Sequence, residues 1–220
     1  MKKITLVVCL LMIAFVNAQD DENQSDKLTF EKGTQFVNLS LSLGTSDSNF
    51  ISETQNFDTK RTHYNINSSY SYAISDNFFI GLGLGYSHVI QEQDDRSDQV
   101  DFESKNNTYR IFPYVRYYKG IGKKLAFFIQ GETRFSFSKT ELENEGDWRT
   151  KNLFIGVRPG LTLILNKNLA LETSIGSLGY SSSDSKNNAN AISNDYNSDS
   201  KGFGLSLNTS NLLFGVNYYF

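Results

Sequence analysis

Apolar and polar side chains alternate residue by residue through eight segments of this 220-residue chain. Such a period of two places the apolar residues on one face of a β-strand and the polar residues on the other. Counting back by twos from Phe220 gives an unbroken apolar face through Leu212. The pattern predicts an all-β fold with strands near 36–44, 64–74, 80–90, 109–117, 125–137, 153–163, 169–180 and 202–220.

The connections between these segments alternate in length. Three short ones at 75–77, 119–124 and 166–168 separate four long polar ones at 45–60, 91–105, 139–149 and 181–201. This alternation is typical of an eight-stranded, antiparallel, up-and-down transmembrane β-barrel, with short periplasmic turns and long extracellular loops. In the last strand the apolar parity slips, and we expect a β-bulge near 209–211.

The polar face of the strands indicates which way the barrel faces. A water-facing sheet surface carries many long charged side chains, whereas this face is mostly Gly, Ser, Asn and Thr. Small residues suit the narrow interior of an eight-stranded barrel, so the apolar face is predicted to contact lipid. A soluble barrel of the lipocalin type, with its apolar face inside, is the alternative.

Five isolated charges interrupt this polar face and are predicted to lie in the lumen. An eight-stranded barrel is just wide enough for its side chains to fill it, and an unpaired buried charge costs several kcal/mol. The charges are therefore expected to pair and to plug the lumen, with a conducting path as the alternative. They are Arg116, Glu132, Arg134, Arg158 and Glu172.

The first 18 residues have the pattern of a secretory signal peptide. Lys2 and Lys3 precede the apolar run Ile4–Val16, which is too short to span a bilayer as a helix. Cys9, the only cysteine, lies within this run. The predicted organisation is a cleaved signal peptide (1–18), a flexible acidic periplasmic tail (19–32) and the barrel domain (33–220).

The charge balance argues against a nucleic-acid partner. The chain carries 21 Lys and Arg against 24 Asp and Glu, and cleavage of the signal peptide would remove two of the cations. Nucleic-acid-binding domains carry basic faces instead.

No catalytic, cofactor-binding or metal site is predicted. A lipid-modifying hydrolase would need His and Ser together on the lipid-facing wall, and neither His63 nor His88 has a suitably spaced Ser. The Gly81, Gly83 and Gly85 repeat lies within a strand rather than before a helix, so it is expected to provide lumen space rather than a nucleotide loop.

The long loops are candidates for contacts outside the cell. Asp94, Asp95 and Asp98 belong to an acidic stretch whose spacing does not match an EF-hand, so a hydrated loop is expected, with Ca²⁺ binding as the alternative. Trp148, the sole tryptophan, is expected to anchor at the extracellular interface, with a partner contact as the alternative.

The signal peptide, the eight strands, the segment 113–118 and the terminal aromatic Phe220 resemble the small outer-membrane β-barrel family common in Bacteroidetes. That family is similar in architecture to the outer-membrane protein A and X barrels. The resemblance implies insertion by the barrel assembly machinery, a partner that reads the last strand. The residues that would carry this assembly signal are Phe214, Val216, Tyr218 and Phe220.

Together these features predict a monomeric, non-enzymatic integral protein of a Gram-negative outer membrane, with both termini periplasmic and with lipid and lipopolysaccharide around it. It would serve envelope integrity or present its acidic loops for surface interaction. A narrow solute channel or a small subunit of a larger outer-membrane complex is the alternative, and a lipid-modifying enzyme comes third.

Overall fold

Residues 27–51, 56–95, 101–142, 146–187, 197–206 and 213–220 are described by a computed structural model. They form ten antiparallel strands and no helix long and apolar enough to cross a membrane. The strands are β1 (Gln35–Ile51), β2 (Asn56–Ser75), β3 (Phe78–Asp95), β4 (Asp101–Gly120), β5 (Leu125–Leu142), β6 (Gly146–Ile164), β7 (Leu169–Ser174), β8 (Ser177–Asn187), β9 (Asn197–Ser206) and β10 (Leu213–Tyr219).

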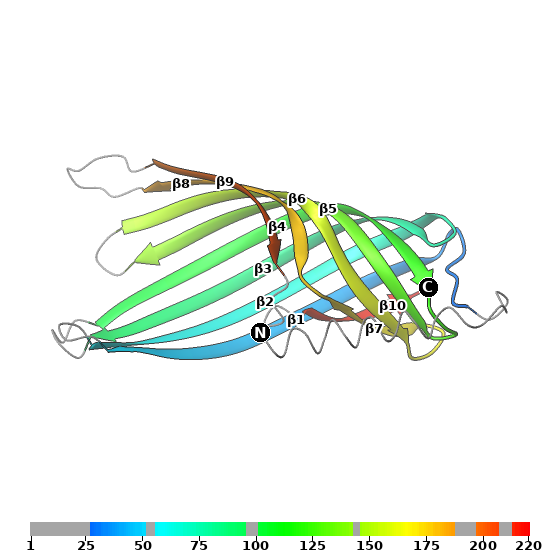
Figure 1. The fold of residues 1–220 in the computed structure, drawn as a ribbon, viewed down its shortest axis with the longest axis horizontal. Helices are drawn as coiled ribbons and strands as arrows, with labels where there is room; N and C mark the ends of the chain where they lie inside the picture. The colour runs from blue at the N-terminus through cyan, green and yellow to red at the C-terminus, as the bar shows by residue number, and fades with distance from the viewer. Residues whose placement is uncertain (1–26, 52–55, 96–100, 143–145, 188–196, 207–212) are drawn as a thin grey trace.

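The strand pairings close β1–β7 and β10 into a ring, a β-barrel, whereas no pairing joins β9 to β1 within the described residues. Each strand from β1 to β6 pairs with the next, β6 also pairs with β7, β7 with β10, and β10 returns to β1. β8 continues the wall beside β6, and β9 pairs with β8 (Figure 1). The antiparallel wall and its closure agree with the predicted barrel.

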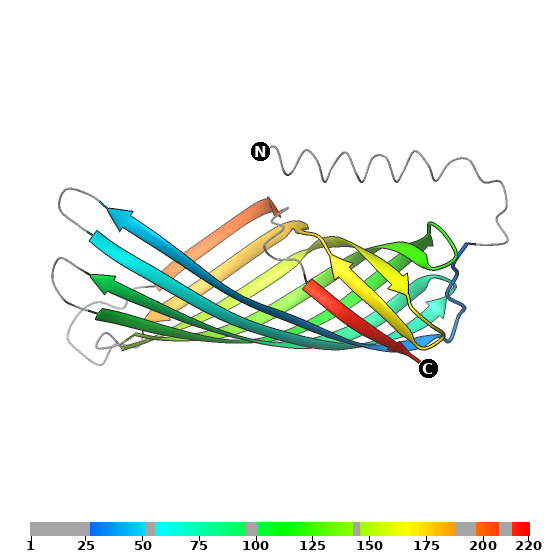
Figure 2. The same ribbon diagram turned by 90° about the horizontal axis from the view of Figure 1, so that it is seen from below.

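The three short turns gather at one end of the molecule, which we call the short-turn end (Figure 2). They connect β2 to β3, β4 to β5 and β6 to β7, as the sequence predicted. The C-terminus lies at the same end. We call the opposite end, where β1 turns into β2 and β3 into β4, the hairpin end.

The structure has ten strands where eight were predicted, because the last two predicted strands are each divided. Between β7 and β8 the partner of Gly160 is Ser174, whereas the partner of Val157 is Leu178, so one extra residue is inserted opposite β6. Gly176 has a positive φ of 66° at this point. The insertion is a β-bulge, and it reverses which alternate residues face outward. The bulge predicted at 209–211 lies outside the described residues.

All four of the predicted long loops are more than half strand, which corrects the sequence analysis. β1 and β2 pair continuously from Gln35–Tyr72 to Ile51–Asn56, and β3 and β4 pair as far as Asp94–Asp101. The apolar alternation ends several residues earlier, because it reports only where the outer surface is apolar. Backbone pairing between antiparallel strands continues without it.

The apolar rows point outward and the polar rows inward, as the sequence predicted. Outward side chains along β1 and β3 such as Leu39 and Leu82 are about half exposed, at 47% and 50%. Inward polar side chains such as Asn217 are buried. The inner face also buries Asn38, Arg116, Gln130, Glu132 and Thr162.

An aromatic cluster closes the short-turn end, and we call it the aromatic floor. Its rings belong to Phe30, Phe36, Phe79, Tyr118, Phe128 and Tyr219, all of them buried. Phe30 lies in the segment before β1, and its ring centroid is 4.6 Å from that of Tyr118 and 5.4 Å from that of Tyr219.

Residues 27–32, which the sequence analysis assigned to a flexible tail, are packed against this end. The Leu28 amide donates to the Gly122 carbonyl at 2.9 Å, and the Phe30 amide donates to Asn77 Oδ1 at 2.9 Å. The polar, acidic composition of the stretch hides the single buried Phe30 that docks it. The remainder of the predicted tail and the predicted signal peptide lie outside the described residues.

The glycine repeat of β3 makes room for aromatic rings, which confirms its predicted role as lumen space. A Cβ atom on Gly83 would lie 2.2 Å from the Phe112 ring, and one on Gly81 would lie 2.4 Å from the Tyr114 ring. Both rings point inward from β4, the strand next to β3. Glycine is therefore required by the close approach of the two rings.

Replacing Gly83 by alanine should destabilise the barrel by about 1–3 kcal/mol, because the methyl group overlaps the Phe112 ring. Urea unfolding of the folded protein, followed by far-UV circular dichroism, measures the loss. Gly204→Ala is the control, since a Cβ there meets no atom within 4 Å. Equal stability of the two variants would contradict the steric explanation, whereas partial rescue in Gly83→Ala/Phe112→Leu would support it.

Candidate functional site: the lumen

The lower part of the lumen, just above the aromatic floor, is built around the buried ion pair of Arg116 and Glu172. Arg116 points inward from β4 and Glu172 from β7. The guanidinium donates to the carboxylate twice, from Nη1 at 2.6 Å and from Nη2 at 3.1 Å. Their side chains are only 5% and 10% exposed. A two-point contact of this kind is among the stronger charge-assisted hydrogen bonds.

Neighbouring side chains accept further hydrogen bonds from the guanidinium of Arg116. Gln130 Oε1 accepts from Arg116 Nε at 2.9 Å and from Nη2 at 2.5 Å, and the Tyr118 hydroxyl accepts from Nη1 at 2.8 Å. The Arg116 guanidinium also lies 4.2 Å from the centroid of the Phe128 ring, a cation–π distance. We call this group the Arg116 cluster.

Two asparagines extend the Arg116 cluster across the junction between the first and last strands. Asn217 of β10 donates to Glu172 Oε2 at 2.8 Å and accepts from Asn38 of β1 at 2.6 Å. Both are buried on the inner face. These bonds join β7, β10 and β1 through side chains as well as through the backbone.

Above the Arg116 cluster the charges no longer balance. Glu132 of β5, whose side chain is fully buried, forms ion pairs with both Arg134 and Arg158, the latter at 3.3 Å. Gln130 donates to Glu132 Oε2 at 2.7 Å and so connects the two levels. Arg110 donates to Asn65 Oδ1 at 2.8 Å instead of to a carboxylate. We call Arg110, Arg134 and Arg158 the upper arginines.

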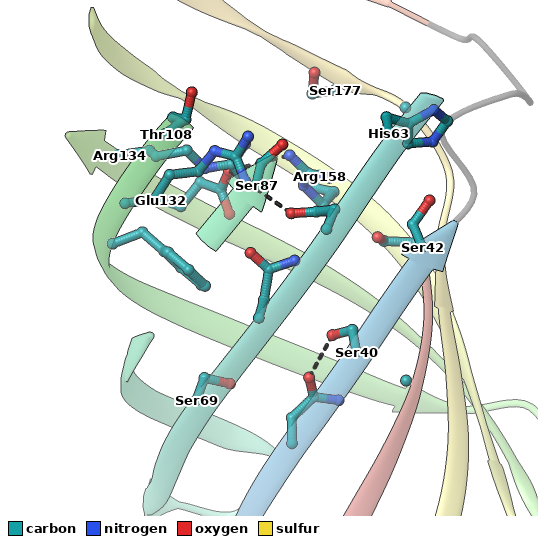
Figure 3. Close-up of a pocket in the computed structure, with 18 of the residues that line it drawn as sticks. Ser40, Ser42, His63, Ser69, Ser87, Thr108, Glu132, Arg134, Arg158 and Ser177 are labelled. Carbon is teal, nitrogen blue, oxygen red and sulfur yellow. Dashed lines mark hydrogen bonds and ion pairs between the residues drawn. The ribbon is translucent and has the colours of Figure 1, made fainter. Parts of the chain in front are cut away.

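The upper arginines surround a cavity of about 1030 Å³. Its wall includes small polar residues from several strands, among them Ser40, Ser42, Ser69 and Ser87. Figure 3 shows Glu132, Arg134 and Arg158 gathered in the same space as these serines and His63. The sequence analysis expected side chains to fill the lumen. They fill it only at the short-turn end, because farther up the inward residues of β1 and β2 opposite the arginines are mostly serines and asparagines, which leave the space between them open.

The structure brings all five charges predicted for the lumen onto the inner face, in two groups. Arg116 pairs with Glu172, and Glu132 with Arg134 and Arg158. The sequence analysis missed Arg110, which shares the inward parity of Arg116 in the same strand. It also missed the neutral partners Gln130, Asn38 and Asn217, because an amide side chain gives no sequence signal until its neighbours across the sheet are known.

Neither histidine has a hydrolase geometry in the described residues. His63 lines the cavity, and a Cβ atom on Gly44 would lie 2.3 Å from its ring. His88 faces outward, with Nδ1 2.8 Å from Asn107 Oδ1, which also accepts from the Tyr86 hydroxyl at 2.7 Å. Within the described part of the chain no three His, Cys, Asp or Glu side chains gather as a metal ion would need.

The predicted contact residues Trp148 and Asp94 lie on different strands, β6 and β3. Trp148 is half-buried in β6 on the face it shares with Asn152, opposite to the exposed Ile155. This placement does not favour an outward-facing membrane anchor. Asp94 is exposed near the end of β3, the side chain of Asp95 is not described, and Asp98 lies outside the described residues.

The residues of the predicted assembly signal form one outward row on β10. Phe214, Val216, Tyr218 and Phe220 are all exposed, from 45% to 66%. The alternate residues Asn217 and Tyr219 face inward. The last strand therefore presents a purely apolar outer face.

Breaking the Arg116–Glu172 pair from one side should cost roughly 3 kcal/mol or more, because it leaves a buried charge without its counter-charge. We expect Glu172→Gln to lower the urea midpoint strongly. The double variant Arg116→Met/Glu172→Leu should lose less unfolding free energy than the sum of the losses measured for Arg116→Met and Glu172→Leu alone. Lys139→Met, which breaks exposed pairs with Glu141 and Asp147, is the control and should change the urea midpoint little. Additive losses in the buried pair would argue against the coupling.

Comparison with solved structures shows a similar fold. The outer membrane protein OprG from Pseudomonas aeruginosa has a TM-score of 0.56 and 9% identity, over 86% of this chain and 97% of that chain. Neisserial surface protein A (NspA) has a TM-score of 0.45 and 12% identity, over 86% and 100%. A major outer membrane protein from Thermus thermophilus has a TM-score of 0.43 and 12% identity, over 85% and 99%.

No protein-family model and no curated protein matches the sequence. At 9% identity the likeness to OprG concerns the fold alone. The ring of strands described above is thus an architecture also found in a solved outer membrane protein.

Proposed function

We propose that this chain is an integral outer-membrane β-barrel protein without enzymatic activity, whose lumen is closed at the periplasmic end. The observation that carries the proposal is the apolar outer surface together with the polar, charged interior. Outward apolar residues of the wall such as Leu41, Ile66 and Leu84 are exposed, while Arg116 and Glu132 are buried. A soluble barrel would have the opposite arrangement.

The outer surface supports lipid contact in two further ways. Contiguous apolar surface on this scale is rare on water-exposed proteins. Exposed aromatic side chains also lie toward both ends, where membrane interfaces favour them. Tyr70, Tyr72, Tyr117, Tyr218 and Phe220 lie toward the short-turn end, and Tyr64, Tyr109, Phe137 and Phe203 toward the hairpin end.

Strand length supports an orientation. A tilted transmembrane strand needs about 9–11 residues, whereas β2 and β4 have 20 each. The polar halves of these strands would therefore extend from the membrane at the hairpin end. Since outer-membrane barrels have short periplasmic turns, we place the short-turn end, with Phe30 and Phe220, in the periplasm.

The role that fits this arrangement is structural or adhesive rather than catalytic. The extended hairpins present acidic side chains such as Asp94 and Glu141, both exposed, to the lipopolysaccharide layer or to an extracellular partner. Insertion by the barrel assembly machinery through the apolar row of β10 belongs to the same proposal.

A narrow solute channel is the second candidate, and the cavity of about 1030 Å³ is the observation that favours it. Two stacked layers oppose a through-path. The Arg116 cluster fills the lumen below the cavity, and the aromatic floor closes the end beneath it.

Leu39→Arg should destabilise the folded protein in lipid vesicles by roughly 2–4 kcal/mol, as expected for an arginine near the bilayer midplane. Asn49→Arg in the same strand is the control, because Asn49 is exposed beyond the apolar rows. If the outer face contacted water instead, both substitutions would stay within about 0.5 kcal/mol. Urea unfolding in vesicles measures the difference.

Planar bilayers containing the folded protein should show no steady single-channel current, because the floor and the Arg116 cluster block the lumen. Electrophoresis with and without boiling provides the control that the inserted protein is folded, since the folded barrel should migrate differently from the boiled chain. Reproducible open channels from such a sample would favour the second candidate.

A further inference from the structure

The upper arginines carry more positive charge than the lumen around them neutralises. Five arginines and two glutamates line the cavity, but one of the arginines, Arg61, is exposed to solvent in β2 and is left out of the count that follows. One arginine and one glutamate are taken up by the Arg116–Glu172 pair. Glu132 then remains as the single carboxylate beside Arg110, Arg134 and Arg158. The three guanidiniums are close enough to repel one another.

The donors of these arginines are also largely unused. A guanidinium has five N–H groups, yet each upper arginine makes one side-chain hydrogen bond within the described residues. Nε of Arg134 and Nε of Arg158 are buried without any acceptor there. Buried polar groups are normally satisfied, so both the charge and the hydrogen bonding lack an anionic partner.

The surplus of positive charge in the lumen is unexpected for this chain, whose formal net charge is −3. Positive charge is concentrated in the lumen even though acidic residues outnumber basic ones overall. A low-dielectric wall strengthens the field inside such a cavity. The cavity volume, about 1030 Å³, is just above the usual upper limit for small-molecule sites.

We propose that the lumen binds a phosphate group between Arg110, Arg134 and Arg158. The surplus of two positive charges matches a phosphate monoester, which is close to a dianion at neutral pH, and the guanidinium fork fits phosphate oxygens. The phosphate belongs either to a small soluble ester or to the headgroup of a lipid. The proposal goes beyond the proposed function, since binding in the lumen does not depend on what the outer face contacts.

The test measures the thermal midpoint of the folded protein in a non-ionic detergent by circular dichroism. Inorganic phosphate is compared with sodium chloride at equal ionic strength and pH. We expect phosphate at about tenfold its dissociation constant to raise the midpoint by roughly 3 °C. A second arm compares short-chain phosphatidic acid with short-chain phosphatidylcholine. A shift with inorganic phosphate supports a soluble ester, and a shift with phosphatidic acid alone supports a lipid headgroup.

Arg110→Gln is the informative variant, because Arg110 has no carboxylate partner in the described residues and glutamine retains a donor for Asn65. It should lose the phosphate shift, and its midpoint in chloride should be equal to or higher than that of the unsubstituted protein, since a repulsion is removed. Arg149→Gln, which removes an exposed arginine of β6, should keep the shift. The proposal is overturned if neither phosphate source shifts the midpoint, or if Arg110→Gln responds like the unsubstituted protein.

Discussion

Closure of the backbone hydrogen-bond ladder is the constraint on which the rest of this structure depends. A strand edge left open in an apolar surrounding would expose unpaired N–H and C=O groups. Here β10 supplies the closing contact, pairing with Phe36–Leu41 of β1 on one side and with β7 on the other. Once the ring is closed, the side chain of each strand residue points either outward or into the lumen. The alternation of the sequence therefore produces an apolar outer surface and a polar lumen.

The lumen then divides into two levels with different chemistry. At the short-turn end, rings and the Arg116 cluster fill the space, and each charge there has its counter-charge. Higher up, inward serines and glycines leave a cavity in which guanidiniums outnumber carboxylates. The lower level, where the charges are paired, suits a permanent seal, because it needs no ligand to neutralise it. The upper level, where positive charge is in surplus, suits a binding site for an anion.

The seal also explains why a segment outside the barrel wall is ordered. Phe30 reaches the rings of Phe79, Tyr118 and Tyr219 from below, and backbone bonds to Gly122 and Ala73 hold its segment in place. The sequence around Phe30 is polar and carries no strand periodicity, so it resembles a solvated tail. Only the position of the ring beneath the barrel shows that it is part of the core.

The sequence by itself determined the strands, their alternation, the short turns and the inward position of Arg116, Glu132, Arg134, Arg158 and Glu172, because period-two patterning is local. It could not give the ends of the strands, since polar β-hairpins lack that pattern, or the break at Gly176, which inserts one residue and shifts the register. Which charge meets which, and that Arg110 has no carboxylate partner in the described chain, only the tertiary structure decided. Those contacts join strands far apart in sequence, and the register across a closed sheet sets them.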